Sequence, residues 1–122
     1  MAERISGAEH EIMEVLWRES PLTANDVAAR VPAEKAWSIR TVKTLLGRLL
    51  AKGILAHEEE GRRYLYRPAV VREDYVARES RALLDRLFGG SVSPLVAHLA
   101  QRDDLSASDI AEIEALLKAL KP

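Results

Sequence analysis

Cationic and hydroxyl side chains gather in one short stretch of the sequence, between residues 38 and 48. Arg40 and Lys43 carry positively charged hydrogen-bond donors, and Thr41 and Thr44 carry a hydroxyl beside a methyl group. These side chains can donate to guanine O6 and N7, contact a thymine methyl or bind a phosphate oxygen. The chemistry they suggest is recognition of double-stranded DNA. The candidate contact residues in this stretch are Ser38, Arg40, Thr41, Lys43, Thr44 and Arg48.

Apolar residues between these polar ones predict the element that presents them. They recur at three- and four-residue intervals, which is typical of an amphipathic helix. Ser38 suits an N-cap, and Gly53, just after Lys52, suits the position that ends a helix. We predict a helix over residues 38–52 with one apolar face against its own domain and one polar face toward DNA. The apolar face comprises Ile39, Val42, Leu45, Leu46, Leu49 and Leu50.

Two helices are predicted before this one and a hairpin after it. Ser6 with Glu9, and Thr23 with Asp26, have the spacing of helix caps and predict helices over 6–19 and 24–31. Beyond Gly53, the β-prone runs 54–57 and 64–66 are separated by a polar segment that contains a glycine. Three helices followed by a hairpin with a charged tip are the element order of a winged helix-turn-helix domain.

The hairpin adds cations to the predicted DNA surface. Arg62 and Arg63 are expected to reach phosphates or an adjacent minor groove. Residues 35–67 hold eight basic and three acidic side chains, although the whole chain has a net charge of −1. Charge is therefore segregated toward the predicted reading helix and hairpin, which favours a nucleic-acid partner. Tyr64 and Tyr66, two residues apart in a strand, are expected to share one face that packs on the reading helix.

The rest of the chain is predicted to be a small helical unit with helices over 71–88, 94–100 and 106–120. Such short helices bury too little apolar surface to be stable alone, so we expect them to pair with a second copy of the chain. We thus predict a mostly α protein with a DNA-binding domain over 1–68 and a linker and dimerisation domain over 69–122. The candidate dimer contacts are Leu84, Leu87, Phe88, Leu95, Val96, Leu99, Ile110, Ile113 and Leu117.

Composition argues against several other classes of protein. The chain has no cysteine, which excludes disulfides, thiolate metal sites and cysteine nucleophiles and fits the reducing cytoplasm. No stretch approaches the roughly 18 apolar residues that span a bilayer, so we expect no membrane insertion. His10 and Glu14 lie four apart, as metal ligands on a helix do, but a zinc protease needs a second histidine, and we expect a solvated helix face. No serine lies in the glycine-flanked elbow of a hydrolase, and we expect no enzyme activity, metal or cofactor.

A homodimer with one reading helix per subunit requires a dyad-symmetric operator. The alternative is a protein-interaction adaptor without DNA binding, because winged helices sometimes bind proteins through the same surface. Salt-dependent DNA affinity distinguishes the two, since an adaptor would lack it.

The segments Trp37–Leu49, Lys52-Gly53 and Gly61–Pro68 together resemble the penicillinase-repressor family of BlaI/MecI type, which has copper-responsive CopY-type relatives. The likeness extends from Ile5 to Leu120. The resemblance implies a homodimeric winged-helix repressor of a resistance or stress-response operon. It also implies derepression when a membrane metallopeptidase sensor causes the repressor to be cut. Well-studied members are cut at an Asn-Phe bond, whose matching positions here are His98 and Leu99. Copper-responsive relatives carry a cysteine-rich C-terminal metal motif, and this chain has no cysteine.

Overall fold

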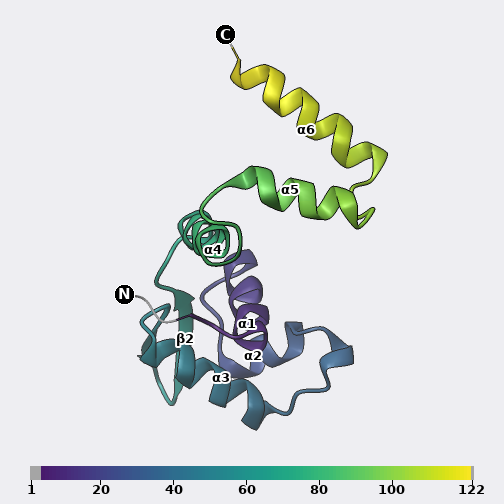
Figure 1. Ribbon diagram of the computed structural model, residues 1–122. Coiled ribbons are helices and arrows are strands. Elements are labelled where there is room, and N and C mark those ends of the chain that lie inside the picture. The colour runs from purple at the N-terminus through teal and green to yellow at the C-terminus, as the bar shows by residue number, and fades with distance from the viewer. Residues whose placement is uncertain (1–3, 122) are drawn as a thin grey trace. The chain divides into compact units, whose positions relative to one another are not determined.

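The structure, a computed structural model, describes residues 4–121 and divides them into two compact units. The first unit ends at Tyr75 and the second begins at Val76, within α4. The predicted order of three helices, a hairpin and three further helices is confirmed. The elements are α1 (Gly7–Arg18), α2 (Ala24–Arg30), the short 3₁₀ helix η1 (Ala33–Lys35), α3 (Ile39–Ala51), β1 (Leu55–Glu60), β2 (Arg63–Pro68), α4 (Arg72–Leu87), α5 (Val92–Gln101) and α6 (Ala107–Leu120) (Figure 1).

Reciprocal caps begin α1 and α2 where the sequence predicts them. The Glu9 amide donates to Ser6 Oγ at 3.1 Å, and the Ser6 amide donates to the Glu9 carboxylate at 3.3 Å. Thr23 and Asp26 make the same exchange at the start of α2, at 3.1 and 3.2 Å. Each cap satisfies an amide that the first turn leaves without a partner inside the helix. Both predicted helix starts are confirmed.

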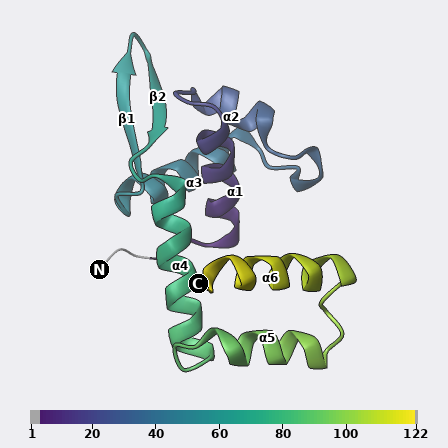
Figure 2. The same ribbon diagram turned by 90° about the horizontal axis from the view of Figure 1, so that it is seen from above.

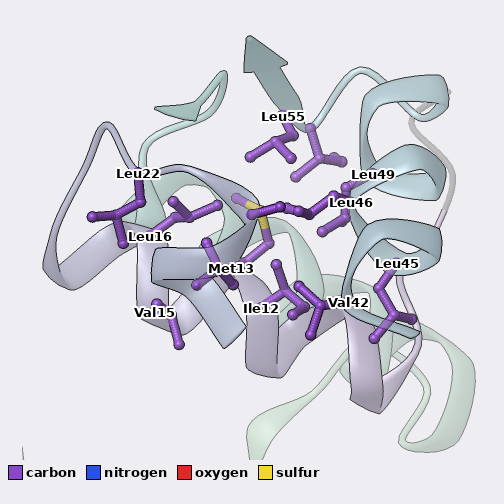
Figure 3. Packing of buried hydrophobic residues seen from close by; sticks show 13 residues of the cluster. Ile12, Met13, Val15, Leu16, Leu22, Val42, Leu45, Leu46, Leu49 and Leu55 are labelled. Carbon is purple, nitrogen blue, oxygen red and sulfur yellow. The ribbon is translucent and has the colours of Figure 1, made fainter. Parts of the chain in front are cut away.

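One apolar core joins all three helices of the first unit to the hairpin. α1 and α3 face each other across it (Figure 3). Burying a large apolar side chain stabilises a fold by about 1.5–3 kcal/mol, so this face fixes the rotation of α3. Ile39 was expected on this face but is 39% exposed, because it begins the helix at the edge of the core. The largest fully buried side chains are Ile12, Met13, Leu16, Val27, Val42, Leu46 and Leu49.

The hairpin is longer than the sequence indicated. β1 and β2 pair antiparallel from Leu55 with Pro68 to Glu60 with Arg63, so the acidic residues expected in the loop belong to β1. The loop is therefore only Gly61 and Arg62, and Gly61 has φ +65. A glycine with positive φ at this position suits the tight turn that joins twisted antiparallel strands. The turn end of the hairpin projects beyond the helices of the first unit (Figure 2).

The second unit leaves its apolar side chains largely uncovered. The helices α4, α5 and α6 pack little against one another, and no residue of α5 or α6 is buried. Among the predicted dimer contacts, Leu84 is 9% exposed, whereas Leu87 is 60% and Leu117 is 54% exposed. Ser106 and Asp109 form the predicted cap of α6. α5 begins two residues earlier than predicted, at Val92.

Candidate nucleic-acid interface

Helix α3 holds a polar outward face on a rigid base. The Thr41 amide donates to Ser38 Oγ at 3.1 Å, so Ser38 is the N-cap of α3. At the other end Gly53 has φ +75, and its amide donates to the Leu50 carbonyl at 3.1 Å. Because the opposite face lies in the core, the outward direction of the polar side chains is set by packing.

The five residues of α3 predicted to contact DNA, and its N-cap Ser38, are all exposed to solvent. Arg40, Thr41, Thr44 and Arg48 line a shallow hollow of about 290 Å³ on the helix surface. These residues lie over the first three turns, where helix-turn-helix proteins place base-reading side chains. A helix that is buried on one face and free on the other has the shape that the major groove admits.

The hydroxyl groups of α3 are held by local hydrogen bonds. Thr44 Oγ1 donates to the Arg40 carbonyl at 3.0 Å, and Ser38 Oγ lies 3.1 Å from Thr41 Oγ1. A threonine hydroxyl that donates backward retains its acceptor lone pairs, and its methyl group has a restricted orientation. The threonines therefore present a defined methyl and acceptor surface, whereas Ser38 has a structural role as the cap.

A groove of about 340 Å³ lies between α3, the hairpin and the start of α2. Lys43 lines it from α3, and Arg62, Arg63 and Tyr64 line it from the hairpin. The structure thus brings together cations from two elements about 20 positions apart in the sequence. Asn25 of α2 also lines the groove. The sequence reasoning missed Asn25 and Tyr64 as candidate contacts. The one signal for Tyr64 was its position directly after Arg63 in the sequence, and no pattern pointed to Asn25.

The prediction that both tyrosines pack on α3 is wrong for Tyr64, whereas Tyr66 is half-buried and packs against the core to which α3 contributes. β1 packs on α3, whereas β2 packs on α1 and α2. Two backbone hydrogen bonds, at 3.0 and 2.8 Å, join Tyr66 to Leu22 and draw β2 toward the connection between α1 and α2. Tyr64 is 45% exposed, and its ring lies edge-on to His57 with the centroids 4.6 Å apart. Tyr64 is therefore a surface residue of the hairpin.

Most cations of this surface have no anionic partner among residues 4–121. Arg40, Lys43, Arg48 and Arg62 form neither a hydrogen bond nor an ion pair through their side chains within that range. Arg63 differs, because its Nη2 lies 2.9 Å from Glu60 Oε1. Asp26 lies near the groove, and the Thr23 hydrogen bonds hold its pKa below the ordinary value, with a smaller contribution from Arg63. The surface is thus cationic, with Glu60 and Asp26 as the carboxylates close to Arg63.

A largely buried ion pair secures the far end of α3. Lys52 Nζ lies 2.8 Å from Glu9 Oε2 and donates to Glu9 Oε1 at 2.9 Å and to the Arg4 carbonyl at 2.8 Å. The contact with Oε2 is electrostatic and lacks hydrogen-bond geometry. Burial raises the pKa of Glu9, but hydrogen bonds from Lys52 and Ser6 outweigh it, so the pKa lies below its ordinary value. The ionised pair therefore ties the end of α3 to the first turn of α1.

The pair His10 and Glu14 does not lie on a simply solvated face, as the sequence suggested. The His10 ring stacks on Tyr75 with centroids 6.0 Å apart, and Trp17 donates its indole N–H to the Val70 carbonyl at 3.0 Å. Arg72 Nε donates to Glu14 at 2.8 Å, and this bond holds the pKa of Glu14 below its ordinary value. The chain entering α4 covers this face of α1. Residues 4–121 hold no cluster of three histidine, aspartate or glutamate side chains placed to bind a metal.

The membrane prediction is tested by helix length and hydropathy. Within the described part of the chain, no helix combines the length and apolar character that crossing a membrane requires.

The helical core, the exposed cationic face of α3 and the cationic hairpin define a winged helix-turn-helix protein of the DNA-binding class. Residues 5–119 match the sequence model of a family described as Penicillinase repressor. The chain therefore belongs to the penicillinase repressor family, whose members are DNA-binding transcriptional repressors and not enzymes. The predicted family and class of protein are confirmed.

Full-length relatives resemble this chain over nearly its whole length. The Penicillinase repressor of Bacillus licheniformis is 35% identical over 118 residues, which cover 97% of this chain and 92% of the relative. The methicillin resistance regulatory protein MecI of Staphylococcus aureus strain N315 is 28% identical over 113 residues, covering 93% and 92%.

Solved structures support the winged-helix assignment. The solution structure of the DNA-binding domain of the repressor BlaI is 39% identical, with a TM-score of 0.55 over 62% of this chain and 92% of that one. The Bacillus licheniformis BlaI monomeric form in complex with the blaP half-operator has the same identity and coverage and a TM-score of 0.52. Wild-type MarR from E. coli, at 17% identity, a TM-score of 0.53 and coverage of 97% and 79%, is similar in fold alone.

Proposed function

We propose that this chain represses transcription by binding double-stranded operator DNA as a homodimer, with α3 in the major groove of each half-site. The observation that carries the proposal is the outward face of α3, whose cations have no partner among the described residues and whose orientation is set by the core. The 39%-identical BlaI was solved with a half-operator, which supports the same use of the corresponding unit here.

Two kinds of DNA contact follow from where the cations lie. Arg40 is at the second position of α3, on the exposed face, and we assign it to a base edge, where a bidentate contact to guanine gives sequence preference. Lys43, Arg62 and Arg63 line the groove beside the hairpin, and we assign them to phosphates, which position the protein without reading sequence. Thr41 and Thr44 offer methyl groups for thymine contacts, and Arg48 lies at the edge of the hollow on α3.

The dimer is assigned to the second unit. Its helices leave large apolar side chains exposed and pack little on one another, so a partner surface would supply the burial that a single chain lacks. The proposed DNA contacts all precede Pro68 and the proposed dimer contacts all follow it, so we propose a DNA-binding domain over 1–68 and a dimerisation domain over 69–122, although the first compact unit extends to Tyr75. The proposed contacts are Leu84, Leu87, Phe88, Leu95, Val96, Leu99, Ile110, Ile113 and Leu117.

The regulated operon is proposed to serve resistance or a stress response. The repressor is proposed to act in the cytoplasm, where the chromosome lies. Relatives named as a penicillinase repressor and a methicillin resistance regulator support the first of these. Release is proposed to follow cleavage at His98-Leu99 after signalling by a membrane metallopeptidase sensor. Both residues lie in α5, which has no side chain buried within a single chain, so local unfolding for a protease should cost little whenever the subunits separate. Cutting there would divide the dimerisation unit and remove the advantage of two linked half-sites.

The test is DNA binding by the full-length protein with two matched variants. A duplex selected from a random pool serves as the cognate site, and a scrambled duplex of equal length serves as the reference. Arg40→Ala should cost roughly 1–3 kcal/mol on the cognate duplex and relax base preference. Arg63→Ala should weaken both duplexes by similar factors. The logarithm of wild-type affinity should fall with the logarithm of salt by about 0.9 for each phosphate contact. A flat salt dependence would contradict the proposal and support the adaptor.

A further inference from the structure

Arg63 differs from the other cations of the DNA surface because a carboxylate already holds it. Glu60 Oε1 lies 2.9 Å from Arg63 Nη2, and the two residues are cross-strand partners that flank the Gly61-Arg62 turn. Arg40, Lys43 and Arg62 have no such partner within the described chain. The proton that Arg63 Nη2 donates to Glu60 is not available to a phosphate, so a bidentate phosphate contact that includes Nη2 must displace the carboxylate.

The strength of this ion pair suits displacement by DNA. The Arg63 and Glu60 side chains are 62% and 57% exposed. Ion pairs at that exposure are weak, and their loss changes an equilibrium by up to about fivefold. The pair is therefore weak enough for a phosphate to displace, yet strong enough to lower the affinity of the hairpin for DNA measurably.

We propose that Glu60 is an internal competitor that occupies Arg63 in the free protein and attenuates the affinity of the hairpin for any duplex. The inference rests on the proposed function, since it assigns Arg63 to a phosphate. Phosphates carry no sequence information, so the attenuation applies equally to cognate and random DNA. Its consequence is weaker retention on every duplex, operator and bulk DNA alike, with the ratio of the two affinities unchanged. A dimer has two hairpins, and the two effects multiply.

A structural role for the same pair predicts the opposite result. Opposite charges on neighbouring strands stabilise a hairpin. If Glu60 served only to hold the hairpin together, its removal would loosen the Arg62 and Arg63 positions and weaken DNA binding. If Glu60 competes with phosphate, its removal strengthens DNA binding. The sign of the change therefore separates the two roles, and a variant that simply misfolds cannot imitate a gain.

The experiment compares Glu60→Gln with Glu58→Gln in the full-length protein. Glu58 lies on the same face of β1, its cross-strand partner is Leu65, and it forms no ion pair with a described residue. The two variants change net charge equally, so the difference between them isolates the ion pair from general repulsion. Binding is measured on the cognate and scrambled duplexes at low and moderate salt.

Glu60→Gln should tighten binding to both duplexes by about 2- to 5-fold per hairpin, or about 4- to 25-fold for a dimer, and more than Glu58→Gln does. The gain should shrink as salt rises and should vanish in an Arg63→Gln background. If the wild type binds DNA in a salt-dependent way but Glu60→Gln and Glu58→Gln bind DNA with equal affinity, this inference is overturned and the proposed function is not. A gain that persists without Arg63 would overturn this inference as well. A wild type that binds neither duplex would overturn both this inference and the proposed function.

Discussion

Replacing Lys52 by methionine should destabilise the protein much more than replacing its partner Glu9 by glutamine. Methionine keeps an apolar stem of similar length but removes the ammonium that lies 2.8 Å from Glu9 Oε2 and donates to Oε1. The Glu9 side chain is only 4% exposed, so its carboxylate would remain buried without a cation. The Lys52 side chain is 17% exposed. In the Glu9→Gln variant it should keep its hydrogen bond to the Arg4 carbonyl, and its ammonium group can extend toward water.

The magnitudes follow from this asymmetry. An uncompensated buried charge costs about 3–5 kcal/mol, which is the expected loss of unfolding free energy for Lys52→Met at neutral pH. Glu9→Gln keeps an acceptor for the Ser6 amide and should cost about 1–2 kcal/mol. The double variant removes both charges and should be more stable than Lys52→Met alone. Lys35→Met is the control, because Lys35 and Glu11 lie 3.9 Å apart with both side chains 38% exposed, and it should cost under about 1 kcal/mol.

The pH dependence of these variants has a defined sign. In the wild type the folded-state pKa of Glu9 lies below its ordinary value of 4.5. The stabilisation that ionised Glu9 gives the fold is therefore fully present above pH 4.5 and is lost as pH falls through the folded-state pKa. Without Lys52, burial dominates and should raise the folded pKa above the unfolded one. The stability deficit of Lys52→Met should therefore narrow between pH 7 and pH 5.

Urea unfolding of the full-length chain, at fixed protein concentration, measures all four variants. If Lys52→Met cost no more than Lys35→Met, or if the double variant were no more stable than Lys52→Met, the asymmetry argued from burial would be wrong.

Two further variants test the caps and the second unit. Thr23→Ala should lower the unfolding free energy by about 1 kcal/mol, because it removes a helix cap. It should also raise the pKa of Asp26 toward 3.8, because the Thr23 hydrogen bonds hold that pKa down. An NMR titration of Asp26 that is unchanged in the variant would contradict this. Leu99→Asp should shift the protein toward monomer in sedimentation and weaken binding to a two-half-site duplex far more than to a single half-site, whereas an unimpaired dimer would place the interface elsewhere.

Features that depend on residues three or four apart could be predicted from the sequence. The caps at Ser6, Thr23, Ser38 and Ser106 and the apolar face of α3 are of this kind, because a helix brings such residues together wherever the rest of the chain lies. The outward direction of Arg40 and Lys43 follows from the same periodicity. These features were sufficient to predict the order of elements and the cationic face.

Features that depend on distant segments could not be predicted in this way. Glutamates are weak strand formers, so residues 58–60 indicated a loop, but pairing with β2 as far as Arg63 holds them in a strand. Tyr66 bonds to Leu22, more than 40 positions earlier, and no strand pattern near Leu22 indicates this. The contacts of Arg72 with Glu14 and of Tyr75 with His10 also join residues more than 50 positions apart, so helix periodicity does not indicate them. The ion pair of Glu60 with Arg63 becomes visible only when the loop is known to be two residues long.

Methylation protection of guanine N7 on the selected operator tests the central claim most directly, because N7 lies in the major groove. A homodimer with α3 of each subunit in that groove should protect guanines in two clusters related by a dyad, about 10 base pairs or a multiple of that apart. Arg40→Ala should weaken protection within both clusters. A single cluster, or binding that leaves every N7 reactive, would contradict the proposal that two α3 helices read the operator.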